Sequence, residues 1–204
     1  TAALIKEFTA AFPKVRHLTF SLLGRDVVDL AAERCFGEGV RTQFNFANAQ
    51  VLVNFGADFL ETWLSPVQYS RQWSETRRPN AANAISYFAH FEPRLSLTAA
   101  NADRWVMNRA GTELSLMLAL LKLVNEKKSG GKLSAGQKAA VQKLVAGVDV
   151  NKIAAEAGVS AKVLELVAGK LAAAERSLVI AGGASTAGPT ASSNGPASRW
   201  SRVA

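Results

Sequence analysis

The apolar residues of this chain follow two spacings, one typical of helices and one typical of buried strands. Leu4, Ile5 and Phe8 recur at helical spacing and predict a helix over residues 2–11, which Pro13 closes. Short apolar runs bounded by glycine, asparagine or proline predict strands instead. By the same criteria we expect further helices over 26–36, 66–77, 112–125, 134–146, 149–157 and 160–175. Strands are expected at 17–20, 51–55, 85–91, 104–107 and 177–181.

Helical and strand segments alternate along the chain, which favours an α/β fold with a doubly wound, mostly parallel sheet and helices on both faces. We expect one such domain over residues 1–181, with a small helical insertion at about 129–175 that follows a polar, glycine-containing loop. Residues 182–204 are rich in Ser, Gly and Ala and lack apolar periodicity. This last segment is therefore expected to be an irregular tail.

The stretch from Gln50 to Pro66 joins a predicted buried strand to a predicted helix. Gly56 allows a sharp turn where the strand ends, and Asp58 follows it at the carboxyl edge of the sheet. Doubly wound sheets bind their ligands at this edge. Pro66 suits the first turn of the next helix, with Ser65 as its N-cap. This order of elements predicts the architecture of a nucleotide site.

The charge of the chain is compatible with several classes of partner. Among 204 residues, 24 are Lys or Arg and 16 are Asp or Glu, which gives a net charge of +8. Nucleic acid, an anionic membrane surface or an acidic protein would each suit that sign. Residues 153–167 have the pattern of a helix-turn-helix, with Gly158 at the turn and Ser160 as a cap. The second helix of that pattern lacks Arg, Asn and Gln to read bases, so DNA binding is a minor alternative.

Few residues have the arrangement of a catalytic or metal site. Cys35 is the single cysteine, which excludes an intrachain disulfide and a thiolate-held iron–sulfur cluster within these residues, and its apolar helix face predicts a packed side chain. His17 and His90 have no second ligand nearby and are expected to be hydrogen-bonded structural residues. Nucleophile-elbow, Walker and dinucleotide-fingerprint motifs are absent from the sequence.

Two further expectations concern the termini and the surface. No apolar run approaches the length of a membrane span, and the chain enters a helix without an initiating Met, so we expect it to be part of a longer protein. Trp63, Tyr69 and Trp73 predict core packing, with a partner surface as the alternative. The predicted helix 66–77 and its basic residues are candidates for such a contact. These basic residues are Arg71, Arg77 and Arg78.

Three segments together resemble the molybdopterin oxidoreductase superfamily. They are residues 51–73, 94–105 and 109–113, of which the first is long and specific. Within the superfamily the resemblance is to the molybdopterin-like, iron–sulfur subunit of alternative complex III, a bacterial quinol:electron-acceptor oxidoreductase. The likeness covers about residues 1–181 and does not include the tail.

The resemblance implies that two segments correspond to those that hold the guanine dinucleotide arm of a pterin in cofactor-bearing members. In the second segment Ala110 replaces a proline and Glu113 replaces the aspartate that meets the guanine edge. Resemblance to the complex III subunit further implies that this pterin site is vestigial and that the chain has no cofactor, metal or catalytic residues of its own. The site residues so implied are Gly56, Asp58, Arg109, Gly111, Thr112 and Glu113.

The function implied by the resemblance is that of a non-catalytic scaffold domain in a membrane-associated, quinol-oxidising electron-transfer complex. Iron–sulfur clusters and haem c are then expected in the rest of the complex. The implied partners are an iron–sulfur domain, a multihaem cytochrome c and polytopic quinol-binding membrane subunits, with no nucleic acid. The implied location is peripheral, on the periplasmic side of the bacterial cytoplasmic membrane. The first alternative is a genuine molybdopterin-guanine-dinucleotide-binding domain of a reductase or dehydrogenase, and the second is a DNA-binding protein.

Overall fold

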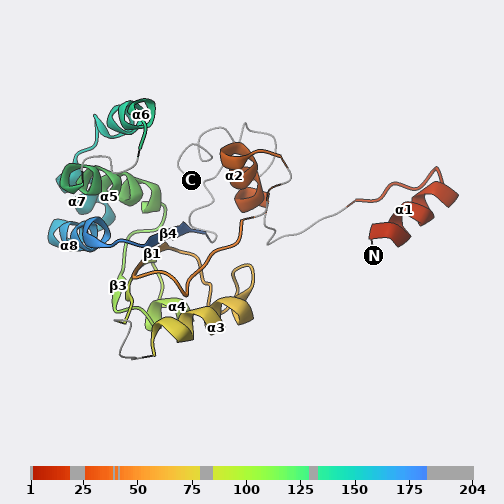
Figure 1. Ribbon diagram of the computed structural model, residues 1–204, viewed down its shortest axis with the longest axis horizontal. Helices are drawn as coiled ribbons and strands as arrows, with labels where there is room; N and C mark the ends of the chain where they lie inside the picture. Colours follow the sequence, from red (N-terminus) through yellow and green to blue (C-terminus); the bar gives the residue numbers. More distant parts are fainter. Residues whose placement is uncertain are drawn as a thin grey trace.

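The computed structural model describes residues 2–18, 26–38, 40, 42–78, 85–128 and 133–182 (Figure 1). Its helices are α1 (Ala2–Ala11), α2 (Asp26–Phe36), α3 (Pro66–Thr76), α4 (Leu97–Ala100), α5 (Glu113–Lys127), α6 (Ala135–Val145), α7 (Val150–Ala157) and α8 (Ala161–Ala173). Its strands are β1 (Val51–Phe55), β2 (Tyr87–Phe91), β3 (Arg104–Val106) and β4 (Ser177–Ala181).

The four strands form one parallel sheet in the order β3-β2-β1-β4. β1 is central and is buried along its whole length, as its run of apolar residues predicts. Val53 lies opposite Ala89 of β2 on one side and opposite Val179 of β4 on the other. Helices cover both faces (Figure 1), so the predicted doubly wound α/β fold is confirmed.

One face of the sheet is covered by α5, α7 and α8 (Figure 1). The buried strand residues Val53, Phe55 and Phe91 meet Leu116 of α5 and Val167 of α8 there. α8 packs against both α5 and β1. The range 129–175, which includes α8, therefore contributes to the main core of the domain.

The other face is covered by α3, α4 and the chain leading into β1, and its core is largely aromatic. Trp63, Tyr69 and Trp73 are all buried in this core, and Phe59 and Phe88 lie among them. The prediction of core packing for the three aromatic residues is thus confirmed. They present no surface to a partner.

Arg77 has a structural role at the end of α3. Its guanidinium forms two hydrogen bonds with Asp103, at 2.9 and 2.5 Å, and lies 4.8 Å from the centre of a Trp73 ring. Asp103 also accepts a hydrogen bond from the Phe88 backbone N–H at 2.8 Å. Burial alone would raise the pKa of Asp103, but the bonds from Arg77 and Phe88 outweigh it and hold the pKa below its usual value. This pair therefore joins α3 to the start of β2.

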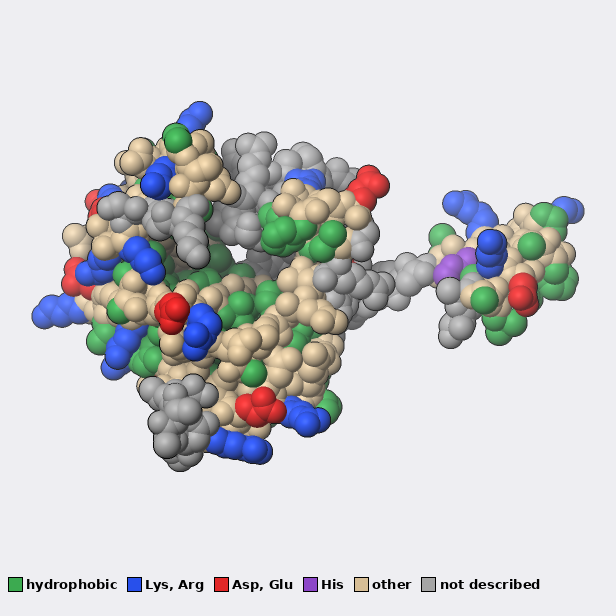
Figure 2. All heavy atoms as spheres, viewed as in Figure 1, with side chains coloured by type: hydrophobic (Ala, Val, Ile, Leu, Met, Phe, Trp, Pro, Cys, Tyr) green, Lys and Arg blue, Asp and Glu red, His purple; other side chains and the backbone are tan. Residues whose placement is uncertain are grey.

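The α7–α8 corner has the turn geometry predicted for a helix-turn-helix. Gly158 adopts φ 71° and ends α7, and Leu164 and Val167 of α8 are fully buried. This side of the second helix packs into the α/β core. Figure 2 shows Lys and Arg side chains scattered over the visible face with Asp and Glu among them.

Three local expectations differ from the structure. Cys35 is exposed because its side of α2 does not pack into the core. His17 and Leu18 form no strand, while the rest of the predicted strand 17–20 lies outside the described residues. The short helix α4, within a segment expected to be mostly loop, begins where the Ser96 hydroxyl accepts a hydrogen bond from the Ala99 N–H. The predicted tail, after Gly182, also lies outside the described part of the chain.

Within the described ranges, no helix has both the length and the apolar character needed to cross a membrane. Figure 1 shows α1 apart from the sheet and its covering helices.

Gly182→Ala is expected to destabilise the domain. Gly182 continues β4, where its N–H donates to the Phe55 carbonyl, and a Cβ at this position would overlap the indole nitrogen of Trp63. Displacing a buried tryptophan costs about 1–3 kcal/mol, measurable by urea unfolding. Gly169→Ala is the control, since a Cβ there meets no atom within 4 Å and should stabilise α8 by up to about 1 kcal/mol. Equal stability of the Gly182→Ala variant and the parent would contradict this packing.

Candidate functional site

The turn after β1 is held in place by a single buried amide. The Asn54 side chain donates to the Ala57 carbonyl at 2.6 Å and accepts from the Ala57 N–H at 3.0 Å. Gly56 takes φ 68°, a conformation that favours glycine, and its N–H donates to the Phe91 carbonyl. The turn therefore has a fixed shape at the carboxyl edge of the sheet, where the sequence predicted it.

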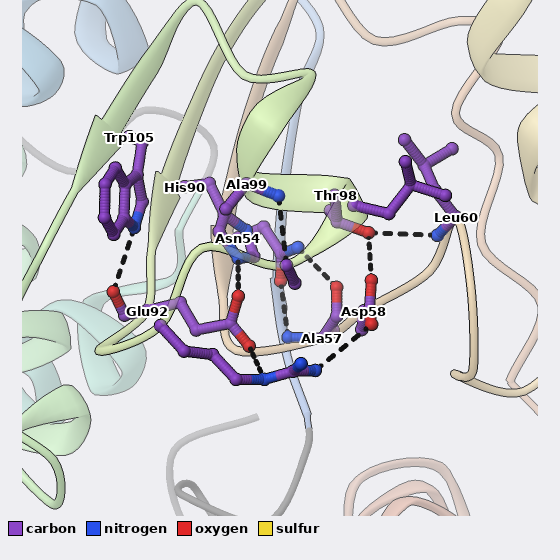
Figure 3. Close-up of polar contacts among 12 residues, drawn as sticks. Asn54, Ala57, Asp58, Leu60, His90, Glu92, Thr98, Ala99 and Trp105 are labelled. Carbon is purple, nitrogen blue, oxygen red and sulfur yellow. Dashed lines mark hydrogen bonds and ion pairs between the residues drawn. The ribbon is translucent and has the colours of Figure 1, made fainter.

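Asp58 leaves this turn toward the protein interior and is only 4% exposed. Its Oδ1 accepts a hydrogen bond from the Thr98 hydroxyl at 2.6 Å, and its Oδ2 pairs with Arg94 at 3.3 Å (Figure 3). Its backbone carbonyl accepts from the N–H groups of Thr62 and Trp63. Asp58 thus organises the loop that leads to α3.

Thr98 of α4 connects this loop to the segment after β2. Its hydroxyl oxygen accepts from the Leu60 N–H at 3.1 Å while donating to Asp58 (Figure 3). Thr98 lies in the segment 94–105 that carries the resemblance, but it was not predicted as a site residue, because its partner Asp58 is forty positions away in the chain.

Glu92 extends the network along the end of β2. Its two carboxylate oxygens pair with Arg94 Nε at 3.3 Å and with His90 Nε2 at 3.0 Å. Burial of Glu92 would raise its pKa, but hydrogen bonds from His90 and Ser96 and the charges of His90 and Arg94 outweigh burial and lower the pKa below its usual value. A continuous polar chain therefore runs from His90 through Glu92 and Arg94 to Asp58. His90 is a hydrogen-bonded structural histidine, as predicted.

The second predicted segment, residues 109–113, follows β3 and is organised by Asn108. The Asn108 side-chain amide donates to the Arg109 carbonyl at 2.9 Å, to the Thr112 hydroxyl at 3.2 Å and to Glu113 Oε1 at 3.0 Å. Gly111 supplies the positive φ of 82° that the loop requires. Asn108 was not predicted, because it lies just before the motif and matches no sequence pattern.

Arg109 is directed toward the end of α7. Its backbone N–H donates to the Ala157 carbonyl and its Nη1 donates to the Glu156 carbonyl, both at 2.9 Å. A cation at a helix C-terminus interacts favourably with the helix dipole and with the unpaired carbonyl groups there. In this structure Arg109 therefore fastens the α7–α8 corner to the loop after β3.

Glu113 begins α5 and is 1% exposed. Its Oε2 has no hydrogen-bond partner, and neither has Oδ1 of the adjacent Asn108. Thr112 occupies the predicted N-cap position, but its hydroxyl donates to the Arg109 carbonyl instead of capping the helix. Two buried acceptor atoms are thus left at the positive end of α5.

The two predicted segments share the carboxyl edge of the sheet because β1 and β3 run parallel. They lead to opposite faces, however: the Asp58 loop enters α3, and Glu113 begins α5. None of the hydrogen bonds described above joins one segment to the other. The segments therefore form two separate halves of a candidate site.

Comparisons with known proteins identify a curated relative and a structural neighbour of the chain. No family model matches the chain. The chain is 34% identical over 146 residues to the menaquinone reductase, molybdopterin-binding-like subunit of Nitratidesulfovibrio vulgaris. The alignment covers 72% of this chain and 20% of that protein, so the chain spans about one fifth of this curated relative.

A solved structure, acetylene hydratase from Pelobacter acetylenicus, superimposes with a TM-score of 0.57 over 78% of this chain and 21% of that one, at 20% identity. The chain has a molybdopterin oxidoreductase fold. The relative and the structural neighbour together support the molybdopterin oxidoreductase-like superfamily.

The molybdopterin oxidoreductase fold implies a pterin cofactor, and the first half of the candidate site does not fit its nucleotide arm. Asp58 is buried behind Thr98 and Arg94, which engage both of its carboxylate oxygens. The Asp58 carboxylate is therefore not available to accept a hydrogen bond from a nucleotide hydroxyl or base. The second half differs, because Glu113 Oε2 is a buried hydrogen-bond acceptor that has no donor.

Thr98→Val is expected to lower the free energy of unfolding by about 1–3 kcal/mol, because it leaves Asp58 Oδ1 and the Leu60 N–H without their partner. Valine keeps the shape of threonine, so the effect isolates the hydroxyl. Urea unfolding followed by tryptophan fluorescence measures it. Thr62→Val, at an exposed position of the same loop, should change stability by less than about 0.5 kcal/mol. Equal effects at the two positions would contradict the role of Thr98.

Glu92→Gln is expected to flatten the acid dependence of stability. Because folding lowers the Glu92 pKa, ionised Glu92 stabilises the parent above the usual glutamate pKa of about 4.3. This contribution disappears as the pH falls through the lowered pKa, and the variant lacks it. The free energy of unfolding, measured between about pH 6 and pH 3, should therefore fall less in Glu92→Gln than in the parent. Glu61→Gln, at an exposed position, is the control for removing one carboxylate, and equal flattening by both variants would contradict the role of Glu92.

Proposed function

We propose that this chain is a non-catalytic, cofactor-less domain of a molybdopterin-like subunit in a membrane-associated quinone–quinol electron-transfer complex. Its role is to scaffold the iron–sulfur and cytochrome c components. The observation that carries the proposal is the state of Asp58, whose carboxylate is buried and used for internal contacts. Arg109 is also used for internal contacts, because its Nη1 donates to the Glu156 carbonyl at the end of α7.

The curated relative supports the quinone part of the proposal. That protein is named as a molybdopterin-binding-like subunit of a menaquinone reductase. We propose the quinol-oxidising direction and the arrangement of alternative complex III on the resemblance of residues 51–73, 94–105 and 109–113. The expected partners are an iron–sulfur domain, a multihaem cytochrome c and polytopic quinol-binding subunits. The domain would then lie on the periplasmic side of the membrane, held there by these partners.

The proposal predicts that the native protein contains no molybdenum or tungsten. The measurement is elemental analysis by mass spectrometry on the protein purified from membranes with its partners, expressed per polypeptide. Metal well below one atom in ten chains is expected, because the Asp58 half of the site does not receive a ligand. About one atom of either metal per chain would overturn the scaffold proposal.

One observation favours a second function, a genuine pterin-guanine-dinucleotide-binding domain. Glu113 Oε2 and Asn108 Oδ1 are buried acceptors without donors, and leaving such atoms unpaired costs about 1–3 kcal/mol each. A guanine edge has adjacent N–H donors that would satisfy these atoms once a bound ligand displaced the groups that cover them, since Glu113 is 1% and Asn108 3% exposed. Acid treatment of the native protein should release a guanine nucleotide in a one-to-one ratio if this second function holds, and none if the domain is a scaffold.

A further inference from the structure

The edge of the sheet opposite the candidate site is rich in exposed cations. The strands begin at this amino edge, and α3, α5 and α8 end there, since these helices run back across the sheet from its carboxyl edge. Interaction with a helix C-terminus accounts for the lysines at the ends of α5 and α8. It does not account for an arginine at the start of β3. The exposed cations of this edge are Arg78, Arg104, Lys127, Lys128 and Lys170.

Contacts between elements bring these cations to one surface around Tyr87, at the start of β2. Lys170 Nζ lies 5.3 Å from the centre of the Tyr87 ring. Burial raises the pKa of Tyr87, although the nearby Arg104 acts in the opposite direction. Lys128 Nζ donates to the Ala174 carbonyl at 3.4 Å, which places the end of α5 beside the end of α8. Cations from α5, α8 and β3 therefore share one surface.

The acidic side chains of this edge leave the five exposed cations without partners. Three of the acids pair with other arginines, namely Glu75, Asp103 and Glu175. Glu126 of α5 is also exposed at this edge. None of the five cations forms an ion pair with a carboxylate in the part of the chain that the structure describes. The adjoining segments 79–84 and 129–132 contain no Asp or Glu in their sequences.

The carboxyl edge uses its arginines differently. Arg94 pairs with both Asp58 and Glu92, and Arg109 donates to a carbonyl at the end of α7. Those arginines are engaged inside the domain, whereas the five cations of the amino edge neutralise no carboxylate among the described residues. The positive charge of the amino edge is therefore available to an external anion.

We propose that the amino edge of the sheet is a docking surface for anionic phospholipid headgroups, so that the strands begin on the side of the domain that faces the bilayer. Three of its five exposed cations are lysines. Lysine is depleted at protein–protein interfaces. Clusters of Lys and Arg attract anionic lipids instead, at about fivefold in affinity for each cation.

An exposed apolar residue at the same edge also favours a bilayer as the partner. Ile85 lies two positions before Tyr87 and is 53% exposed. The next residue, Ser86, offers its carbonyl to Arg77, so this short segment lies at the charged edge. Apolar side chains next to cations are typical of surfaces that bind the interface of a bilayer.

This inference rests on the membrane association in the proposed function, but it does not depend on the absence of a pterin. About one atom of molybdenum per chain would overturn the scaffold role and leave lipid docking intact. Loss of the lipid preference described below would overturn docking alone.

The experiment is vesicle flotation with the full-length protein that contains this domain. Vesicles of phosphatidylcholine with about one third phosphatidylglycerol are compared with vesicles of phosphatidylcholine alone. The test variant combines Arg104→Gln and Lys170→Gln, the two cations next to Tyr87. The control variant combines Lys143→Gln and Lys162→Gln, exposed on α6 and at the start of α8, and has the same net charge. Urea unfolding shows that each variant is folded.

The parent is expected to bind the anionic vesicles at least tenfold more tightly than the neutral ones, and salt should weaken this binding. The test variant should lose at least fivefold in affinity for the anionic vesicles, and the control less than twofold. Equal losses in the two variants, or equal binding of the parent to both kinds of vesicle, would overturn the proposal. A test variant that binds vesicles like the parent but no longer co-purifies with a partner subunit would show a protein interface and overturn it too.

A second readout uses the complete assembly in a membrane. A spin label attached to a cysteine at position 170 should relax at least twofold faster when nickel-chelating lipids are added than a label at position 162. Both positions belong to α8, one in its last turn and one in its first. Equal relaxation at the two positions would show that the amino edge does not face the bilayer.

Discussion

Burial of β1 on both faces is the constraint on which the rest of the domain depends. Every residue of this strand is buried between an aliphatic core on the α5–α8 side and an aromatic core on the α3 side. Apolar side chains can satisfy that requirement, but polar ones need partners within the protein. Polar residues are therefore concentrated where the strands end, and they pair with one another there.

The network at the carboxyl edge follows directly from this constraint. Asn54 is the one polar side chain of β1, and both ends of its amide bond to Ala57. Arg94 pairs with both Asp58 and Glu92, and Glu92 also pairs with the buried His90. The result is a loop system with little freedom, whose shape is determined by its own hydrogen bonds. Some buried polar atoms next to these networks remain without a hydrogen-bond partner, namely His90 Nδ1, Asn108 Oδ1 and Glu113 Oε2.

Periodicity was sufficient to predict the sheet and most helices, because the spacing of apolar residues depends on whether an element is buried on one face or on both. The apolar run of β4 and the stripe of α5 illustrate this. Local capping was predicted less well: Ser65, Thr112 and Ser160 occupy N-cap positions, yet none makes the side-chain capping bond. We predicted a packed Cys35 because it lies on an apolar helix face, but Cys35 is exposed. An apolar helix face does not specify which element, if any, packs against each of its residues.

The candidate site was predictable only in part. Gly56, Asp58 and the 109–113 loop lie at the sheet edge, as the order of strands and turns implied. The residues that decide their chemistry come from other segments and were not predicted as site residues. Arg94 and Thr98 lie in the segment 94–105, and Asn108 lies just before the segment 109–113. Long-range pairing of this kind is set by tertiary structure, and one sequence holds no periodic or spacing signal for it.

The contacts of Arg109 have a consequence for reading related sequences. Because this arginine closes the end of α7, selection for folding alone is enough to keep it in a descendant that no longer meets a nucleotide. An arginine in this position therefore does not by itself distinguish a protein that binds a nucleotide from one that does not.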